Sequence, residues 1–159
     1  MDAGHRGRAD TQPQDGNVED DLVSNILYGP ARRLLGSQLD DDAMIQLAEK
    51  EFQGKAFSVV KNWMLLDVLL PATEEKVIEA QGLKPTVLYA NNVLFDSTSS
   101  ALPASGVITG YQQEHVGYLF VAEEARFVLM GAGHRKTVGL PSIIALRNAL
   151  SGSGNAGHE

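Results

Sequence analysis

Residues 56–70, "AFSVVKNWMLLDVLL", combine β-branched and aliphatic side chains in a pattern typical of a strand. Apolar and polar residues alternate in the first half, whereas the second half is apolar except for Asp67. Continuous apolar runs of this kind indicate a strand that is covered on both faces. The stretch predicts one long strand near 57–69, or two short strands broken near Lys61 and Asn62.

Further strands follow this one along the chain. "PTVLYANNVLFDS" (85–97) favours a single strand near 86–95, although a two-residue turn at Asn91 and Asn92 would make it a hairpin. Residues 98–106, "TSSALPASG", have the composition of a loop. The remaining strands are expected near 107–111, 117–122 and 126–131, and the last two form a hairpin closed through Glu123 and Glu124.

Helical periodicity occurs on both sides of the strand-rich region. The clearest case follows Asp40, which can cap a helix whose apolar face includes Met44, Ala48 and Phe52. Helices are predicted near 20–28, 41–52, 73–81 and 141–150. Helices and strands are segregated rather than strictly alternating, so the sequence predicts an α+β fold. We expect one domain, with an antiparallel or mixed sheet of about five strands and helices packed on one face.

The two ends of the chain differ in composition from the region between them. Residues 1–19 have almost no apolar content, and residues 151–159, "SGSGNAGHE", resemble a flexible linker. We therefore predict a disordered tail at 1–19, a globular domain at 20–150 and a flexible tail at 151–159.

Composition restricts the classes of function. The 159 residues are 43% hydrophobic, carry a net charge of −7 and include no cysteine, which removes disulfides, thiol catalysis and cysteine-based metal sites. An acidic chain without a basic stripe disfavours binding to duplex nucleic acid. No apolar run is long enough for a membrane span, and the first residues lack the apolar core of a secretory signal. The composition favours the cytoplasm, and it is compatible with a homo-oligomer.

The segment "FVLMGAGHRKT" (127–137) resembles a phosphate-binding loop at first sight. A Walker loop requires glycine directly before its Lys–Thr pair, because the backbone must wrap around the phosphates there. Arg135 occupies that position, so the segment is not a Walker loop. A weaker anion-binding hypothesis remains, in which the strand ends in a turn that forms a backbone nest. Its candidate residues are Gly131, Gly133, His134, Arg135 and Lys136.

Several polar residues lie within or beside the predicted strands. Asp67 interrupts an apolar run, so it is either paired or exposed, or it is a carboxylate whose raised pKa serves acid–base chemistry. Asp96 can cap the turn that follows its strand, and His115 precedes a strand. Asn91 and Asn92 can form a turn or cross-strand hydrogen bonds. No nucleophile-elbow or metal-binding spacing accompanies these residues, so we predict no metal site and no cofactor.

Three segments in this order, "NWMLLDVLL", "VLYANNVLFDS" and "FVLMGAGHRKT", resemble a family of short bacterial and prophage-associated proteins described only as a domain of unknown function. The resemblance covers roughly residues 40–150. It implies a bacterial, phage-derived, cytoplasmic protein, and it carries over no catalytic residues.

Three hypotheses of function follow. The first, favoured because no catalytic constellation is recognisable, is a small acidic protein-interaction module without catalytic activity, directed at a host or defence protein. The second is an anion or ligand sensor that uses the Gly131–Lys136 segment. The third is a small hydrolase or transferase with a site near Asp67, Asp96 and His115.

Overall fold

The computed structural model describes residues 14–123 and 125–156, and within them the chain forms four helices and eight strands. In chain order the elements are α2 (Gln14–Tyr28), β1 (Arg32–Leu35), α3 (Asp41–Phe52), β2 (Phe57–Leu69), α4 (Ala72–Ala80), β3 (Thr86–Asp96), β4 (Val107–Ile108), β5 (Gln112–Val116), β6 (Leu119–Ala122), β7 (Ala125–Met130), β8 (Ala132–Gly139) and α5 (Leu140–Ala156). The strands belong to one sheet, so the predicted α+β class and single domain are confirmed.

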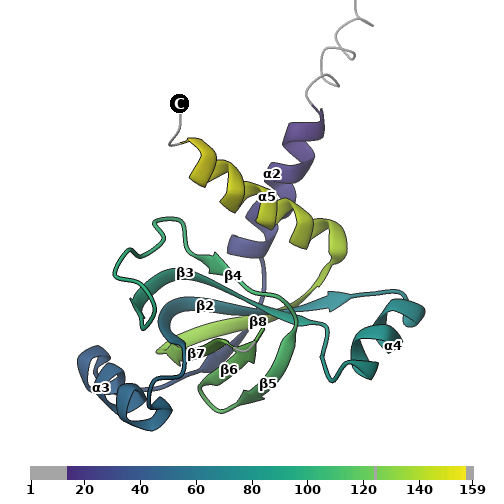
Figure 1. The fold of residues 1–159 in the computed structure, drawn as a ribbon. Coiled ribbons are helices and arrows are strands. Elements are labelled where there is room, and N and C mark those ends of the chain that lie inside the picture. The colour runs from purple at the N-terminus through teal and green to yellow at the C-terminus, as the bar shows by residue number, and fades with distance from the viewer. Residues whose placement is uncertain (1–13, 124, 157–159) are drawn as a thin grey trace, which may run out of the picture.

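Strand β2 organises the sheet. Strand β3 pairs antiparallel along one edge of β2, while β7 and then β8 pair parallel along the other edge. Strands β6 and β5 continue the sheet antiparallel from β7, and β1 pairs antiparallel with β8. A bridge between Lys84 and Gln112 connects β5 back to the start of β3, so the mixed sheet curls on itself (Figure 1).

An irregularity crosses the middle of the sheet. Val60 and Trp63 both pack in the interior of the curled sheet although they are three residues apart, so the regular alternation of β2 is interrupted between them. Asn62 lies within this interruption, and its φ of 55° is in the left-handed region that asparagine tolerates better than most residues. The register with β3 shifts nearby, between Val59 and Val60. Strand β2 is therefore one strand with an interruption close to where the sequence indicated a break.

Three apolar clusters fill the two faces of the curled sheet. The inner face packs against itself around Trp63, Leu65 and Phe120. On the outer face, α3 packs on the first half of β2, and α2 and α5 pack on the second half. Helices α2 and α5 cross each other above the sheet, and α3 lies at its other end (Figure 1). Helix α4 connects β2 to β3 without burying any residue.

The prediction of about five strands was wrong, because the described residues contain eight. Strands β1, β5 and β8 were not predicted. Strands β1 and β5 are four and five residues long, and such short segments become strands through their partners rather than through their composition. The predicted turn at Gly131–Lys136 was also wrong. Strand β8 occupies this segment, with β1 on one side and β2 on the other. Two glycines and three basic or imidazole side chains had favoured a turn, but pairing on both edges decides the conformation.

The other predicted elements are present, but α2 begins six residues before its predicted start at 20 and α5 ends six residues after its predicted end at 150. Asn91 and Asn92 lie inside β3, so the hairpin alternative does not occur. Of the predicted tails, residues 1–13 and 157–159 lie outside the described residues, while α2 begins at Gln14 and α5 extends to Ala156. None of the described helices is both long enough and apolar enough to cross a membrane.

Candidate functional site

The outer face of the sheet has a hollow of about 250 Å³ beside the C-terminal end of α2. Four elements contribute to it, namely α2, β2, β3 and β8. Its lining residues are Leu27, Tyr28, Asn62, Trp63, Met64, Tyr89, Asn91, Ala132 and His134. The hollow thus lies at the irregularity of β2, beyond the part of the outer face that α2 covers.

Two tyrosines of very different exposure border the hollow. Tyr28 is the last residue of α2 and is 84% exposed, whereas Tyr89 of β3 is only 6% exposed. The Tyr89 hydroxyl donates a hydrogen bond to Oδ1 of Asn91 at 3.2 Å. Burial, and after it the neighbouring Tyr28, raises the pKa of Tyr89. The Tyr89 phenol is therefore a neutral hydrogen-bonding group rather than a base in the physiological range.

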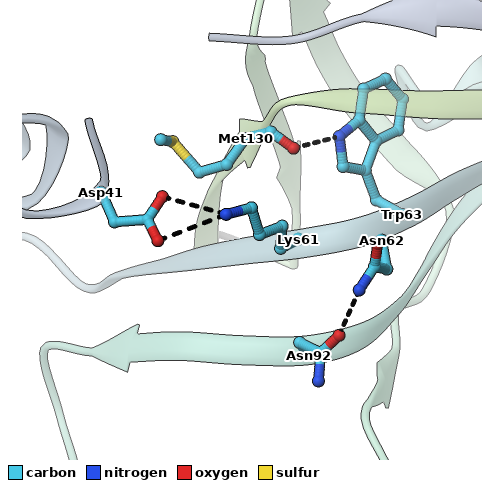
Figure 2. Close-up of polar contacts among 6 residues, drawn as sticks. All are labelled: Asp41, Lys61, Asn62, Trp63, Asn92 and Met130. Atoms are coloured by element: carbon cyan, nitrogen blue, oxygen red, sulfur yellow. Dashed lines mark hydrogen bonds and ion pairs between the residues drawn. The ribbon is translucent and has the colours of Figure 1, made fainter. Parts of the chain in front are cut away.

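Polar contacts hold the irregular part of β2 in place (Figure 2). The Asn62 amide donates to Oδ1 of Asn92 on β3, and the Lys61 ammonium pairs with Asp41 of α3 at 3.3 Å. On the inner face, the Trp63 indole N–H donates to the carbonyl of Met130 at 3.1 Å. Three successive residues of β2 are thus bound to three different elements, which makes the floor of the hollow well defined.

The lining offers binding chemistry. It presents the amides of Asn62 and Asn91, the phenol of Tyr28 and the imidazole of His134 beside the apolar side chains of Leu27 and Met64. None of the lining residues is a carboxylate, lysine, serine or threonine. The arrangement suits recognition of a group that is partly apolar and partly hydrogen-bonding.

The glycines of the proposed anion nest serve packing. Gly131 takes a φ of 65° at the junction of β7 and β8, which glycine adopts without steric cost. At Gly133 a β-carbon would overlap the indole ring of Trp63, so only glycine allows the ring to lie against β8. These roles explain the "GAG" sequence without an anion.

The two basic residues of the same segment point to opposite faces of β8, because neighbouring residues in a strand alternate. Arg135 forms a bidentate pair with Asp67, with Nε and Nη2 each 2.8 Å from a carboxylate oxygen. Lys136 donates to the carbonyls of Asn25 and Ile26 at 2.6 and 2.9 Å, which caps the C-terminal end of α2. Burial lowers the pKa of Lys136. The two side chains thus hold the fold together, and in this arrangement they do not meet around one anion.

Asp67 is a paired carboxylate in a half-buried position. Burial alone would raise its pKa, but hydrogen bonds from Arg135 and Thr86, together with the charges of Arg135 and Arg32, lower it. The Thr86 hydroxyl contributes a bond of 2.7 Å. The direction of the shift is opposite to the one that the acid–base hypothesis requires. Asp67 therefore acts as a structural anion.

The residues of the hydrolase hypothesis do not form one site. Asp67 and Asp96 are associated with opposite ends of β2, since Asp96 pairs with Ser58 and the nine residue steps from Ser58 to Asp67 span about 30 Å. Asp96 accepts hydrogen bonds from the Thr98 N–H and hydroxyl, which confirms its predicted role in the following turn. His115, on β5, contacts the carbonyl of Gly117 at 3.1 Å. Burial lowers the pKa of His115. Among the described residues, no group of three or more potential ligands gathers to hold a metal ion.

Sequence reasoning singled out two lining residues of the hollow, Asn91 and His134, and missed the others. Tyr28 could have been found from the Gly29–Pro30 stop, which places it at an exposed helix end. Asn62 was recognised as an interruption of the strand but not as a wall of a site. The hollow itself has no sequence signal, because four distant segments form it.

A family described as a domain of unknown function, DUF6957, matches residues 35–145, and because the match spans more than half of the chain, the chain belongs to this family. The match begins at the last residue of β1 and ends within α5. The sheet side of the hollow therefore lies inside the family domain, and α2 with Tyr28 lies outside it. No curated protein and no solved structure matches the chain.

Proposed function

We propose that this chain is a protein-interaction module without catalytic activity, and that the hollow beside Tyr28 is its recognition site. The observation that carries the proposal is the exposed tyrosine at the mouth of a hollow with mixed apolar and amide lining. Tyrosine is enriched among the residues that contribute most to protein–protein binding. At 84% exposure, Tyr28 has little role in the core and is available to a partner.

The surroundings of the hollow support a protein ligand. The hollow of about 250 Å³ adjoins a depression of about 420 Å³ that shares Tyr28, Met64 and His134 with it, so an extended protein surface can cover both. A hollow of this size accommodates one protruding side chain, which is how many protein interfaces place an anchor residue. Asn62 and Asn91 would supply the hydrogen bonds that select this side chain.

No observation favours the other two hypotheses. A hydrolase near Asp67, Asp96 and His115 would need these side chains together, and an anion sensor would need Arg135 and Lys136 on one face. The resemblance to prophage-associated proteins extends the proposal: the protein is phage-derived, acts in the bacterial cytoplasm, and has a host or defence protein as its partner.

A photo-crosslinking amino acid at position 28 tests the proposal in the native cytoplasm. We expect the full-length chain carrying it to form one stoichiometric adduct with a protein. The matched control places the same group at Val77, which is 57% exposed on α4 and distant from the hollow. Equal adducts from both positions, or an adduct from position 77 alone, would contradict the proposal.

A second measurement separates binding from catalysis. Tyr28→Ala and His134→Ala should each reduce capture of the crosslinked protein, whereas Val77→Ala should leave it unchanged. A low-molecular-weight metabolite that binds the purified chain and is chemically converted by it would show that the chain is an enzyme, and the proposal would fail.

A further inference from the structure

The free edge of β1 lies next to the hollow and has a distinctive charge. Strand β1 is the last strand at its end of the sheet, and within the described part of the chain it pairs with β8 alone. An unpaired edge presents backbone N–H and C=O groups that can accept an additional strand. Arg32, Arg33 and Leu35 on this edge are exposed.

Strands β1 and β8 form a basic region in an acidic protein. They contain Arg32, Arg33, Arg135 and Lys136 and no acidic residue, although the whole chain has a net charge of −7. Arg135 is engaged with Asp67, and Lys136 with the end of α2. The charges that face solvent on this edge are therefore those of Arg32 and Arg33.

The edge is continuous with the hollow. Arg33 lies opposite His134, and Leu35 lies opposite Ala132, and both of these partners line the hollow. A second depression, which shares Tyr28, Met64 and His134 with the first, extends to Gly29 and Ala31, directly before β1. A partner that fills the hollow can therefore continue along the surface to the strand edge.

We propose that the partner contributes an extended acidic segment that adds to β1 as an antiparallel or parallel strand, with its carboxylates beside Arg32 and Arg33. The backbone bonds supply affinity, and the charges select the segment over neutral or basic ones. This inference rests on the proposed function, because it names the partner chemistry of the same surface.

The test uses peptides selected from a random 12-residue library on the full-length chain. We expect the selected peptides to carry acidic residues at adjacent positions, because Arg32 and Arg33 are successive residues of β1 and point to opposite faces of the sheet. Binding of a labelled selected peptide, measured by fluorescence anisotropy, should weaken about tenfold or more in Arg33→Glu, because attraction becomes repulsion. Lys76→Glu makes the same change of charge on exposed α4 and should leave the affinity within about twofold, because it lies away from the interface.

Methylated peptides test strand addition separately from charge. N-methylation removes a backbone donor, so methylation of the amides that face β1 should abolish binding, and methylation of the alternate amides should be tolerated. Circular dichroism of Arg33→Glu verifies that the variant is folded.

The outcomes distinguish this inference from the proposed function. Suppose that the selected peptides need Tyr28 for binding. If they show no acidic preference, or if Arg33→Glu or methylation has no effect on their affinity, strand addition is overturned and the hollow remains a binding site. Peptides that are unaffected by Tyr28→Ala contradict the proposed function. A library that returns no binder overturns the inference. A dimer of the chain, detected by sedimentation and dissociated by Arg33→Glu, also overturns it, because the edge of β1 would then bind a second copy.

Discussion

Asp67 and Asn62 both interrupt the apolar sequence of β2, yet the two positions have opposite surroundings. Asp67 is half-buried on the second half of the strand, where Arg135 and Thr86 bind both of its oxygens. Asn62 is exposed in the middle of the strand, where its backbone is left-handed and its side chain contacts only Asn92 among the hydrogen bonds of the described residues. At Asp67 both carboxylate oxygens are hydrogen-bonded to neighbouring side chains, whereas Asn62 borders an open hollow.

This difference shows how a polar residue in a strand should be interpreted. A charge in an apolar run is a strong sequence signal, and it led to a hypothesis of acid–base chemistry at Asp67. The structure explains that charge by a cross-strand partner, since a half-buried carboxylate is stable when hydrogen-bonded. The neutral Asn62 gave a weaker signal, but it lies where the outer face is uncovered. The candidate site is therefore marked by a part of the outer face that no helix covers, and not by a charge in the strand.

The largest loss of stability is expected at Gly133. This residue packs against the ring of Trp63, which lies between Asn62 and Asp67 in β2. Gly133→Ala should lower the free energy of unfolding by about 3 kcal/mol, because the new methyl group overlaps the buried Trp63 ring. Urea unfolding provides the measurement. Gly139→Ala in the same strand is the control, since its β-carbon would meet Pro141 at an ordinary 3.5 Å. Similar losses in both variants would mean that strand propensity, not the indole contact, requires glycine.

Removal of Arg135 should destabilise the surroundings of Asp67 and leave those of Asn62 unchanged. Arg135→Ala leaves the half-buried Asp67 without its bidentate partner, and we expect a loss of about 2 kcal/mol in unfolding free energy. The comparison is Lys61→Ala, which breaks the more exposed pair with Asp41, for which we expect about 0.5 kcal/mol or less. A double-mutant cycle with Asp67→Asn isolates the pair. A coupling near zero would show that the pair adds nothing to stability.

The stability that Asp67 contributes should depend on pH. The folded pKa of Asp67 lies below its unfolded value. Its contribution is therefore fully present above the unfolded pKa of about 4 and is lost as pH falls through the folded pKa. Urea unfolding from pH 7 to pH 2.5 should show the wild type more stable than Asp67→Asn at neutral pH, with the gap closing in acid. A gap that widens as pH falls would reverse the assigned direction of the shift.

The smallest effect is expected at Asn62. Asn62→Ala should be less stable than Asn62→Gly by about 1 kcal/mol, because alanine tolerates the left-handed φ less well than glycine does. Both variants lose the contact with Asn92, so their difference reports the backbone only. Equal unfolding free energies, or a less stable glycine variant, would indicate that the backbone at position 62 is extended in solution.

The sequence predicted the elements whose signals are local. The strand at 57–69 and the helix at 41–52 agree with β2 and α3 because long apolar patterns are properties of contiguous residues. The predicted cap was wrong, since Asp40 precedes α3 without a side-chain hydrogen bond to it. The turn role of Asp96 was predictable for the same reason, since its partner is two residues away.

Elements and contacts that depend on distant partners could not be predicted. The "AGHRKTVG" segment of β8 has the composition of a turn, and it is a strand because β1 and β2 pair with its two edges. The partners of Arg135 and Lys136 are 68 and 110 or 111 residues away in sequence. No local pattern contains such information.

Local sequence was enough to predict the α+β class, the central strand and the principal helices, and to rule out a Walker loop, because each follows from the order of neighbouring residues. Only the folded chain shows that the sheet curls, that Gly133 accommodates Trp63, and that Tyr28 meets Asn62, Asn91 and His134 around a hollow. A site on the outer face is defined by the surface that the packed helices leave open. That choice depends on the register and packing of segments that are far apart in the chain.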